Sequence, residues 1–216
     1  MGSERVRLAD LLAAVSVATD LGNGQEPEKA ICACLVATAP ARRMGTPGAE
    51  VSDVYYTALL RHLGCTATAH EEAYLGGDEL VSRPAAERAD FGNPREGLLL
   101  LLQLGKGTGT DRVRHLARAL RSGKKGDQAI LGALCEVGAR LAERLGLSPA
   151  VRDGLYQSFE RWDGAGTPQG LASEGICLPA RLGDVGHQGS SSIASAARRR
   201  PWRWSAAGPG GGSIRR

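Results

Sequence analysis

The sequence has few aromatic side chains, since two Phe, four Tyr and three Trp make up 4% of its 216 residues. Ala, Leu and Gly are abundant instead, which favours closely packed helices over a β-sandwich. No apolar run reaches the roughly 18 residues that a membrane-spanning helix needs. The N-terminus, MGSERVRLADLL, also lacks the apolar segment and cleavage site of an export signal. We therefore expect a cytoplasmic protein with no membrane contact and one domain of ordinary size.

The chain holds five cysteines, an odd number, which does not indicate a set of disulfide bonds. Without an export signal, this count argues for reduced thiols. Cys32 and Cys34 lie two positions apart in an apolar helical run, where their side chains face different ways. We predict a pair of small core residues here rather than a metal site.

Acidic residues are absent from one part of the chain, residues 189–216, which holds six of the 27 basic residues. Residues 1–188 therefore carry 21 basic against 23 acidic side chains, a net charge of −2. The body is nearly neutral, so its charge gives no reason to expect a nucleic-acid surface there.

Apolar residues recur at helical spacing through most of the body, and no segment alternates as a strand does. We expect Pro40 to kink or end the second helix, Gly64 to follow the third as its C′ residue, and residues 122–127 (SGKKGD) to form a turn. Ser148 and Pro149 form a cap followed by proline at the first helical position. The fold class is all-α, with helices expected at 6–21, 31–44, 49–63, 78–88, 93–104, 111–120, 128–145, 149–159 and 178–187.

Residues 160–182 (ERWDGAGTPQGLASEGICLPARL) contain the most distinctive stretch of the sequence. Three glycines and Pro168 alternate over seven residues, a density that requires a shaped loop between helices. Shaped loops on rigid helices often carry functional sites, although a purely structural loop is the alternative.

This stretch resembles the signature of the HD-GYP branch of the HD superfamily of metal-dependent phosphohydrolases. The matching run is Glu160-Arg161-Trp162-Asp163-Gly164, then Gly166, Pro168, Gly170-Leu171 and Pro179-Ala180-Arg181. Upstream, residues 58–64 (ALLRHLG) resemble the helix end that carries the family's His-Asp doublet. The resemblance covers residues 25–188 and implies an HD-like helical bundle, preceded by an N-terminal helix at 1–24.

The resemblance also implies a centre of two or three metal ions that activate water for attack on a phosphodiester. Such a centre needs imidazole and carboxylate ligands that converge on one spot. Several are replaced here. The doublet is His62-Leu63, the early histidine falls near Glu28 or Lys29, and the histidine pair is Ser158-Phe159.

The remaining ligand candidates are His62, Glu28, Asp184 and His187, for a divalent iron, manganese or zinc if the site is active and for no metal if it is not. Arg161 and Asp163 are the catalytic candidates. The structural alternatives are a His62 that bonds the last carbonyls of its helix and an Asp163 that forms a turn. Arg161 pairs with Glu160 or with a helix carboxylate inside the body, or else contacts an anion. We expect His70, His115 and the basic stretch 106–125 to be solvated surface.

The character of the sequence changes after His187, where Ser, Arg and Gly dominate residues 189–216. A basic arm that touches nucleic acid or anionic membrane through Trp202 and Trp204 is one interpretation. We favour another, a disordered or frameshifted tail, because G+C-rich codons in a shifted frame can encode the helical sequence VIFHRLGGPEAALAVVRRR. On this hypothesis the bundle lacks its last helices at the C-terminus.

Taken together, these patterns predict a degenerate HD-GYP-like module with a sensory or regulatory role in bacterial signalling. Its partners would be a cyclic dinucleotide or other phosphoester, a regulatory protein, or a DNA-binding domain that once followed. The alternative is an active phosphodiesterase of cyclic dinucleotides of the cyclic di-GMP type, working with a reduced metal site. Nucleic-acid binding through the tail is a third, less favoured hypothesis.

Overall fold

The structure, a computed structural model, describes residues 7–68, 109–199, 203–205 and 213–215. The body is all-helical in these ranges, as predicted, and two short strands, β1 and β2, pair antiparallel in the tail with Trp204 opposite Ile214. The elements are α1 (Leu8–Gly22), α2 (Lys29–Arg43), α3 (Gly48–Leu60), η1 (Leu63–Thr68), α7 (Gly109–Arg144), α8 (Pro149–Tyr156), η2 (Ser173–Gly175), α9 (Leu178–Arg199), β1 (Arg203–Ser205) and β2 (Ser213–Arg215). None of the helices in the described part is long and apolar enough to cross a membrane.

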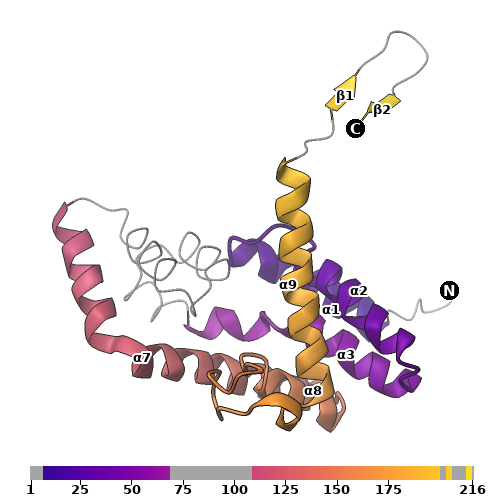
Figure 1. Cartoon of the computed structure of the whole chain (residues 1–216), viewed down its shortest axis with the longest axis horizontal. Coiled ribbons are helices and arrows are strands. Elements are labelled where there is room, and N and C mark those ends of the chain that lie inside the picture. Colours follow the sequence, from indigo (N-terminus) through magenta and orange to yellow (C-terminus); the bar gives the residue numbers. More distant parts are fainter. Residues whose placement is uncertain (1–6, 69–108, 200–202, 206–212, 216) are drawn as a thin grey trace, which may run out of the picture.

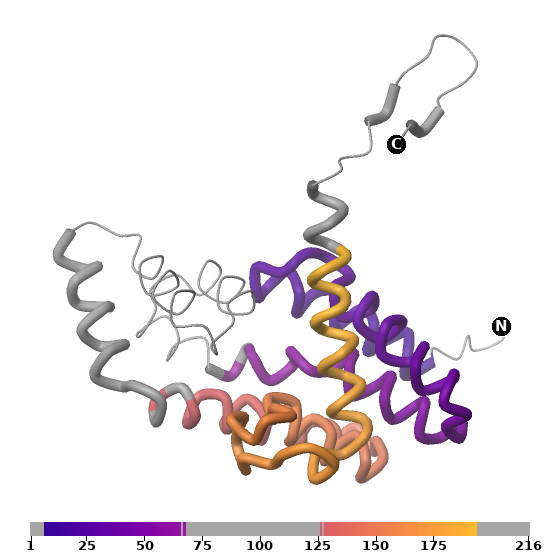
Figure 2. Tube along the Cα trace, viewed as in Figure 1, coloured from indigo at the N-terminus to yellow at the C-terminus, as the bar shows by residue number. Residues whose placement is uncertain are grey.

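The helices form two groups that meet at α3 (Figure 1). On one side, α9 packs along α2 and α3, and α1 covers the start of α2. On the other side, the later part of α7 packs against α8 and η1, and α8 in turn contacts α3. The trace in Figure 2 shows α9 crossing this assembly, so that it joins segments far apart in the sequence.

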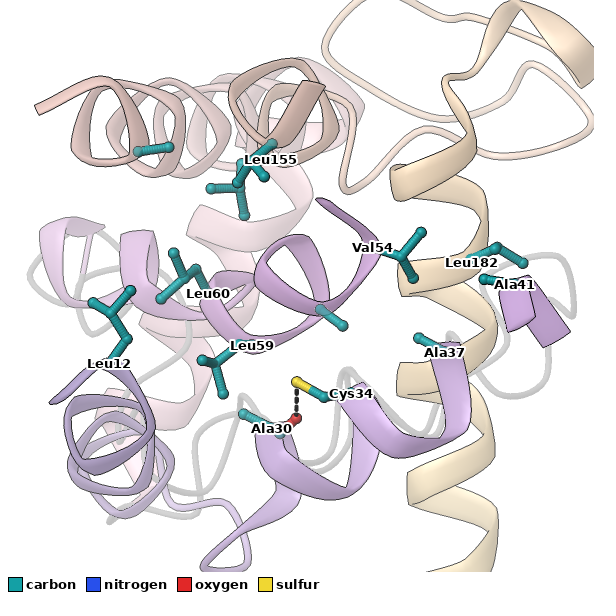
Figure 3. Close-up of a cluster of buried hydrophobic side chains, with 13 residues drawn as sticks. Leu12, Ala30, Cys34, Ala37, Ala41, Val54, Leu59, Leu60, Leu155 and Leu182 are labelled. Carbon is teal, nitrogen blue, oxygen red and sulfur yellow. Dashed lines mark hydrogen bonds between the residues drawn. The ribbon is translucent and has the colours of Figure 1, made fainter. Parts of the chain in front are cut away.

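The core lies where these groups meet, and it is built mainly from small and aliphatic side chains (Figure 3). Val54, Leu59 and Leu60 of α3 are almost fully buried at its centre. Ala33, Ala37 and Ala41 repeat every four residues along α2 and let α9 approach closely. Close packing of small residues therefore takes the place of the aromatic side chains that the sequence lacks.

Several expected local features are confirmed, and others are wrong. Ser148 caps α8, because its Oγ accepts a hydrogen bond from the Val151 amide at 3.2 Å while donating to Asp53 of α3. Cys34 is a core residue and donates to the Ala30 carbonyl oxygen, as Figure 3 shows, but Cys32 is exposed. The prediction of a core residue is thus confirmed for Cys34 and wrong for Cys32.

Gly64 does not end the third helix as its C′ residue. It lies within the 3-10 helix η1, and a Cβ at this position would overlap the Leu134 carbonyl oxygen. Glycine is therefore needed for a close approach of η1 to α7 rather than for a left-handed turn.

Three helix boundaries also differ from expectation. Residues 122–127 lie inside α7 rather than in a turn, and α8 ends at Tyr156 rather than near Phe159. The end of α2 at Arg43 agrees with the predicted end at Met44, so the alternative that Pro40 ends this helix is wrong. The last helix, expected to end near His187, continues to Arg199. The helices expected at 78–88 and 93–104, and the expected surface position of His70, lie outside the described residues.

Candidate functional site

The structure brings together His62 and His187, which are 125 positions apart in the sequence. His62 follows α3 and His187 lies in the middle of α9, and their ring centroids are 4.8 Å apart at an interplanar angle of 82°. Both side chains are buried. Burial, with positive charge nearby from Arg61, lowers the pKa of His187 well below its usual value, so this imidazole is neutral.

Asp20 completes a buried polar cluster that the sequence analysis missed. Its side chain is fully buried at the end of α1. One carboxylate oxygen, Oδ2, accepts a hydrogen bond from the Ala30 amide at 3.0 Å, and Oδ1 lies 3.9 Å from His62 Nδ1. The available signal was helical spacing, since Asp20 follows the buried Leu12 and Ser16 in steps of four residues.

Arg61 is the second residue that sequence reasoning missed, although it precedes His62 directly. Its side chain is only 8% exposed, and its Nη2 donates to Asp184 Oδ1 at 3.1 Å. The guanidinium also lies over the Phe159 ring, 4.9 Å from the centroid. A permanent positive charge therefore sits beside the paired imidazoles.

The four predicted metal ligands are thus only partly brought together. His62 and His187 are neighbours, Asp184 is an ion-pair partner of Arg61, and Glu28 is exposed at the N-cap of α2 with a φ of 66°. Across the part of the chain that the structure describes, no three His, Cys, Asp or Glu side chains are arranged to hold a metal ion.

The glycine-rich loop is held by Glu160 rather than by the two residues predicted to be catalytic. The buried Glu160 carboxylate accepts hydrogen bonds from the amides of Gln169 at 2.6 Å and Leu171 at 2.9 Å. These two bonds close the loop on itself, which explains its shape in structural terms.

Arg161 and Asp163 lie exposed on this loop and bond to each other through two contacts, of 3.1 and 2.7 Å. Arg161 thus pairs with a carboxylate of its own loop, and its expected pairing with Glu160 stays a prediction. Asp163 also accepts the Ala165 amide at 3.0 Å, so its predicted role as a turn former is confirmed. The Arg161 hydrogen bonds and that amide lower the pKa of Asp163 to about 2.

The described helices pack around the buried pair of His62 and His187. No family model matches the chain. The sequence is 26% identical over 180 residues to the 3'3'-cGAMP-specific phosphodiesterase 3 of Vibrio cholerae, across 81% of this chain. A solved structure of a cyclic GMP-AMP specific phosphodiesterase from V. cholerae superposes with a TM-score of 0.60 at 22% identity, covering 89% of this chain.

These two comparisons confirm the resemblance to the HD-GYP branch of the HD phosphohydrolases and the all-helical fold. The chain spans well under half of each relative, 38% of the curated protein and 43% of the solved chain.

HD-domain phosphodiesterases are metal-dependent. To bind metal in the same way, the buried cluster of Asp20, His62 and His187 would have to supply the ligands. A centre of two ions needs several imidazole and carboxylate ligands at one point. Here one oxygen of Asp20 is engaged by a backbone amide, and the Arg61 guanidinium, which repels divalent cations, lies beside the histidines. The described residues therefore do not fit a centre of two metal ions.

Proposed function

We propose that this chain is an HD-type signalling module that binds a cyclic dinucleotide or a related phosphoester without hydrolysing it by the family's two-metal chemistry. The observation that carries the proposal is the buried Arg61 guanidinium beside the His62–His187 pair. It supplies fixed positive charge at the place where the resemblance predicts metal ions. The V. cholerae relatives, both named as phosphodiesterases of cyclic GMP-AMP, support the ligand class.

Metal stoichiometry and ligand binding, measured on the same sample, test this proposal. The full chain would be incubated with iron, manganese or zinc, desalted, analysed by mass spectrometry for bound metal, and titrated calorimetrically with 3'3'-cGAMP and cyclic di-GMP. The proposal predicts far less than one tightly held ion per chain together with measurable binding of a cyclic dinucleotide. Two ions per chain that His62→Ala removes would contradict it.

A second candidate function is an active phosphodiesterase with a reduced metal site. The curated relative is named as a phosphodiesterase, which favours this second candidate. Such an enzyme would hold one metal ion between the neighbouring His62 and His187. A stoichiometry of one ion per chain, lost in either histidine variant and accompanied by turnover, would establish this alternative instead.

A further inference from the structure

Arg61 is a buried cation with an incompletely used set of donors. Its side chain is 92% buried, and its Nε donates to no acceptor among the described residues. The one hydrogen bond that its guanidinium makes there is that of Nη2 to Asp184. A buried guanidinium gains most from bidentate pairing, since each buried donor without a partner costs free energy.

The partner of this cation is half-exposed and contacts it through one oxygen. Asp184 is 44% exposed on α9, and one of its carboxylate oxygens accepts from Arg61, at 3.1 Å. Because the Asp184 side chain is half-exposed, its carboxylate can turn into solvent when another anion takes its place on Arg61. The outer edge of the guanidinium is therefore covered by a replaceable carboxylate.

The other charged groups around Arg61 leave it available for an anion. Glu160 is buried nearby, but its two oxygens are taken by the Gln169 and Leu171 amides. His187 is neutral, and both Arg61 and Lys29 add positive charge to its surroundings. Asp20 is held by the Ala30 amide, and its other oxygen lies near His62.

We infer that Arg61 is a phosphate-binding residue and that Asp184 occupies its place in the absence of ligand. A phosphate group presents two oxygens at the spacing of the guanidinium fork, so it makes the bidentate contact that Asp184 does not make. The ligand is thus recognised through a phosphomonoester or phosphodiester group. This inference deepens the proposed function and rests on it for the class of ligand.

The test compares variants of the full chain in EDTA, so that metal ions play no part. Calorimetric titration uses two probes, 3'3'-cGAMP and inorganic phosphate. Asp184→Asn removes the competing charge and should tighten binding about threefold or more. Arg61→Lys keeps the charge but loses the fork, and should weaken binding by about tenfold or more.

Asp153→Asn is the matched control, because Asp153 is also a half-exposed helix carboxylate paired with a neighbouring arginine, Arg152. It should leave the affinity unchanged. The inference is overturned if Asp184→Asn binds both probes no more tightly than the control, or if neither probe binds the parent chain or Asp184→Asn. Should Arg61→Lys fail to fold, Asp184→Asn decides alone.

The two probes also separate a phosphate site from a nucleotide site. Tightening for both probes assigns a general phosphate contact to Arg61, and tightening for 3'3'-cGAMP alone assigns a contact that needs the whole cyclic dinucleotide. Hydrolysis of 3'3'-cGAMP by protein that holds two metal ions would contradict the proposed function. The comparison of Asp184→Asn with its control in EDTA would still decide the role of Arg61.

Discussion

Glu160 shows how a single buried carboxylate can define a loop. Because it accepts two backbone amides from residues nine and eleven positions later, the loop is closed by charge-assisted hydrogen bonds. The family signature includes this glutamate, and here its structural role is clear without any appeal to chemistry at a metal.

Replacing this carboxylate by an amide therefore tests the loop directly. Glu160→Gln keeps the size of the side chain but leaves one of the two amides with a neutral acceptor and the other with no acceptor at all. We expect the free energy of unfolding to fall by about 1–3 kcal/mol. Thermal unfolding followed by circular dichroism measures the change, and Glu174→Gln, at an exposed glutamate, serves as the control. Equal midpoints for the two variants would refute the role of Glu160.

The buried His187 makes stability depend on pH in a defined direction. Its pKa in the folded chain is lowered well below 6.5, chiefly by burial, so the folded state binds a proton less readily than the unfolded chain does. Its contribution to stability is complete above about pH 6.5 and is lost progressively as the pH falls from that value toward the lowered pKa of the folded state.

We therefore expect the unfolding midpoint of the parent chain to fall between pH 7.5 and pH 5. His187→Gln should show a shallower fall, because glutamine does not titrate. Denaturant unfolding at several pH values measures both slopes. Identical slopes for parent and variant would mean that His187 is not held neutral by the fold.

Residue-scale prediction from the sequence succeeded where spacing or a motif was informative. The Ser148 cap and the turn at Asp163 followed from residue type and position alone. Arg61 and Asp20 were missed because burial of a charged side chain depends on tertiary contacts that neighbouring residues do not reveal. The meeting of His62 and His187 was expected through the family resemblance, not through their own sequence context.

At the scale of elements, the contact of α2 with α9 depends on small side chains. A Cβ at Gly186 would overlap the Ala33 carbonyl oxygen and lie 2.7 Å from Ala37 Cβ. The backbone at this contact cannot move aside as a flexible side chain can, so an added methyl group should push α2 and α9 apart.

Gly186→Ala is accordingly expected to lower the free energy of unfolding by about 1–3 kcal/mol. Gly22→Ala is the matched control, since Gly22 is also helical but has open space around it. The control should be neutral or stabilised by about 0.5–1 kcal/mol. Chemical denaturation compares the two, and a Gly186→Ala variant as stable as Gly22→Ala would contradict the close contact.

The type of each described helix was predictable, but several boundaries were not. Residues 122–127 were predicted as a turn because two glycines lie close together there, yet no proline stops the helix. Each glycine costs only about 1 kcal/mol inside a helix, so helical segments on both sides can merge into one, as in α7. The later end of α9 was missed for a different reason, because its packing partner is α2, distant in sequence.

On the scale of the whole molecule, the boundary between body and tail lies later than the change in composition suggests. Ser190 is buried, and Gly189 lies against Val36 of α2. The composition changes after His187, but the packed helix continues beyond it. The assignment of residues 189–216 to a disordered or frameshifted tail remains a prediction.

Two truncations test where the body ends. Ending the chain after Arg199 keeps all of α9 and should change the unfolding midpoint by less than about 2 °C. Ending it after Val185 removes the buried Gly186, His187 and Ser190, and should lower the midpoint by more than about 5 °C. Differential scanning calorimetry measures both, and equal midpoints would place the boundary before Gly186.

The proposed replacement of two-metal chemistry by the fixed charge of Arg61 predicts that this chain does not hydrolyse a cyclic dinucleotide. The most direct test is turnover of 3'3'-cGAMP by the full chain after loading with manganese, iron or zinc, with product followed by chromatography. We expect no hydrolysis above the rate of the His62→Ala variant. Metal-dependent hydrolysis that this variant abolishes would show that a catalytic centre survives, and would contradict the account.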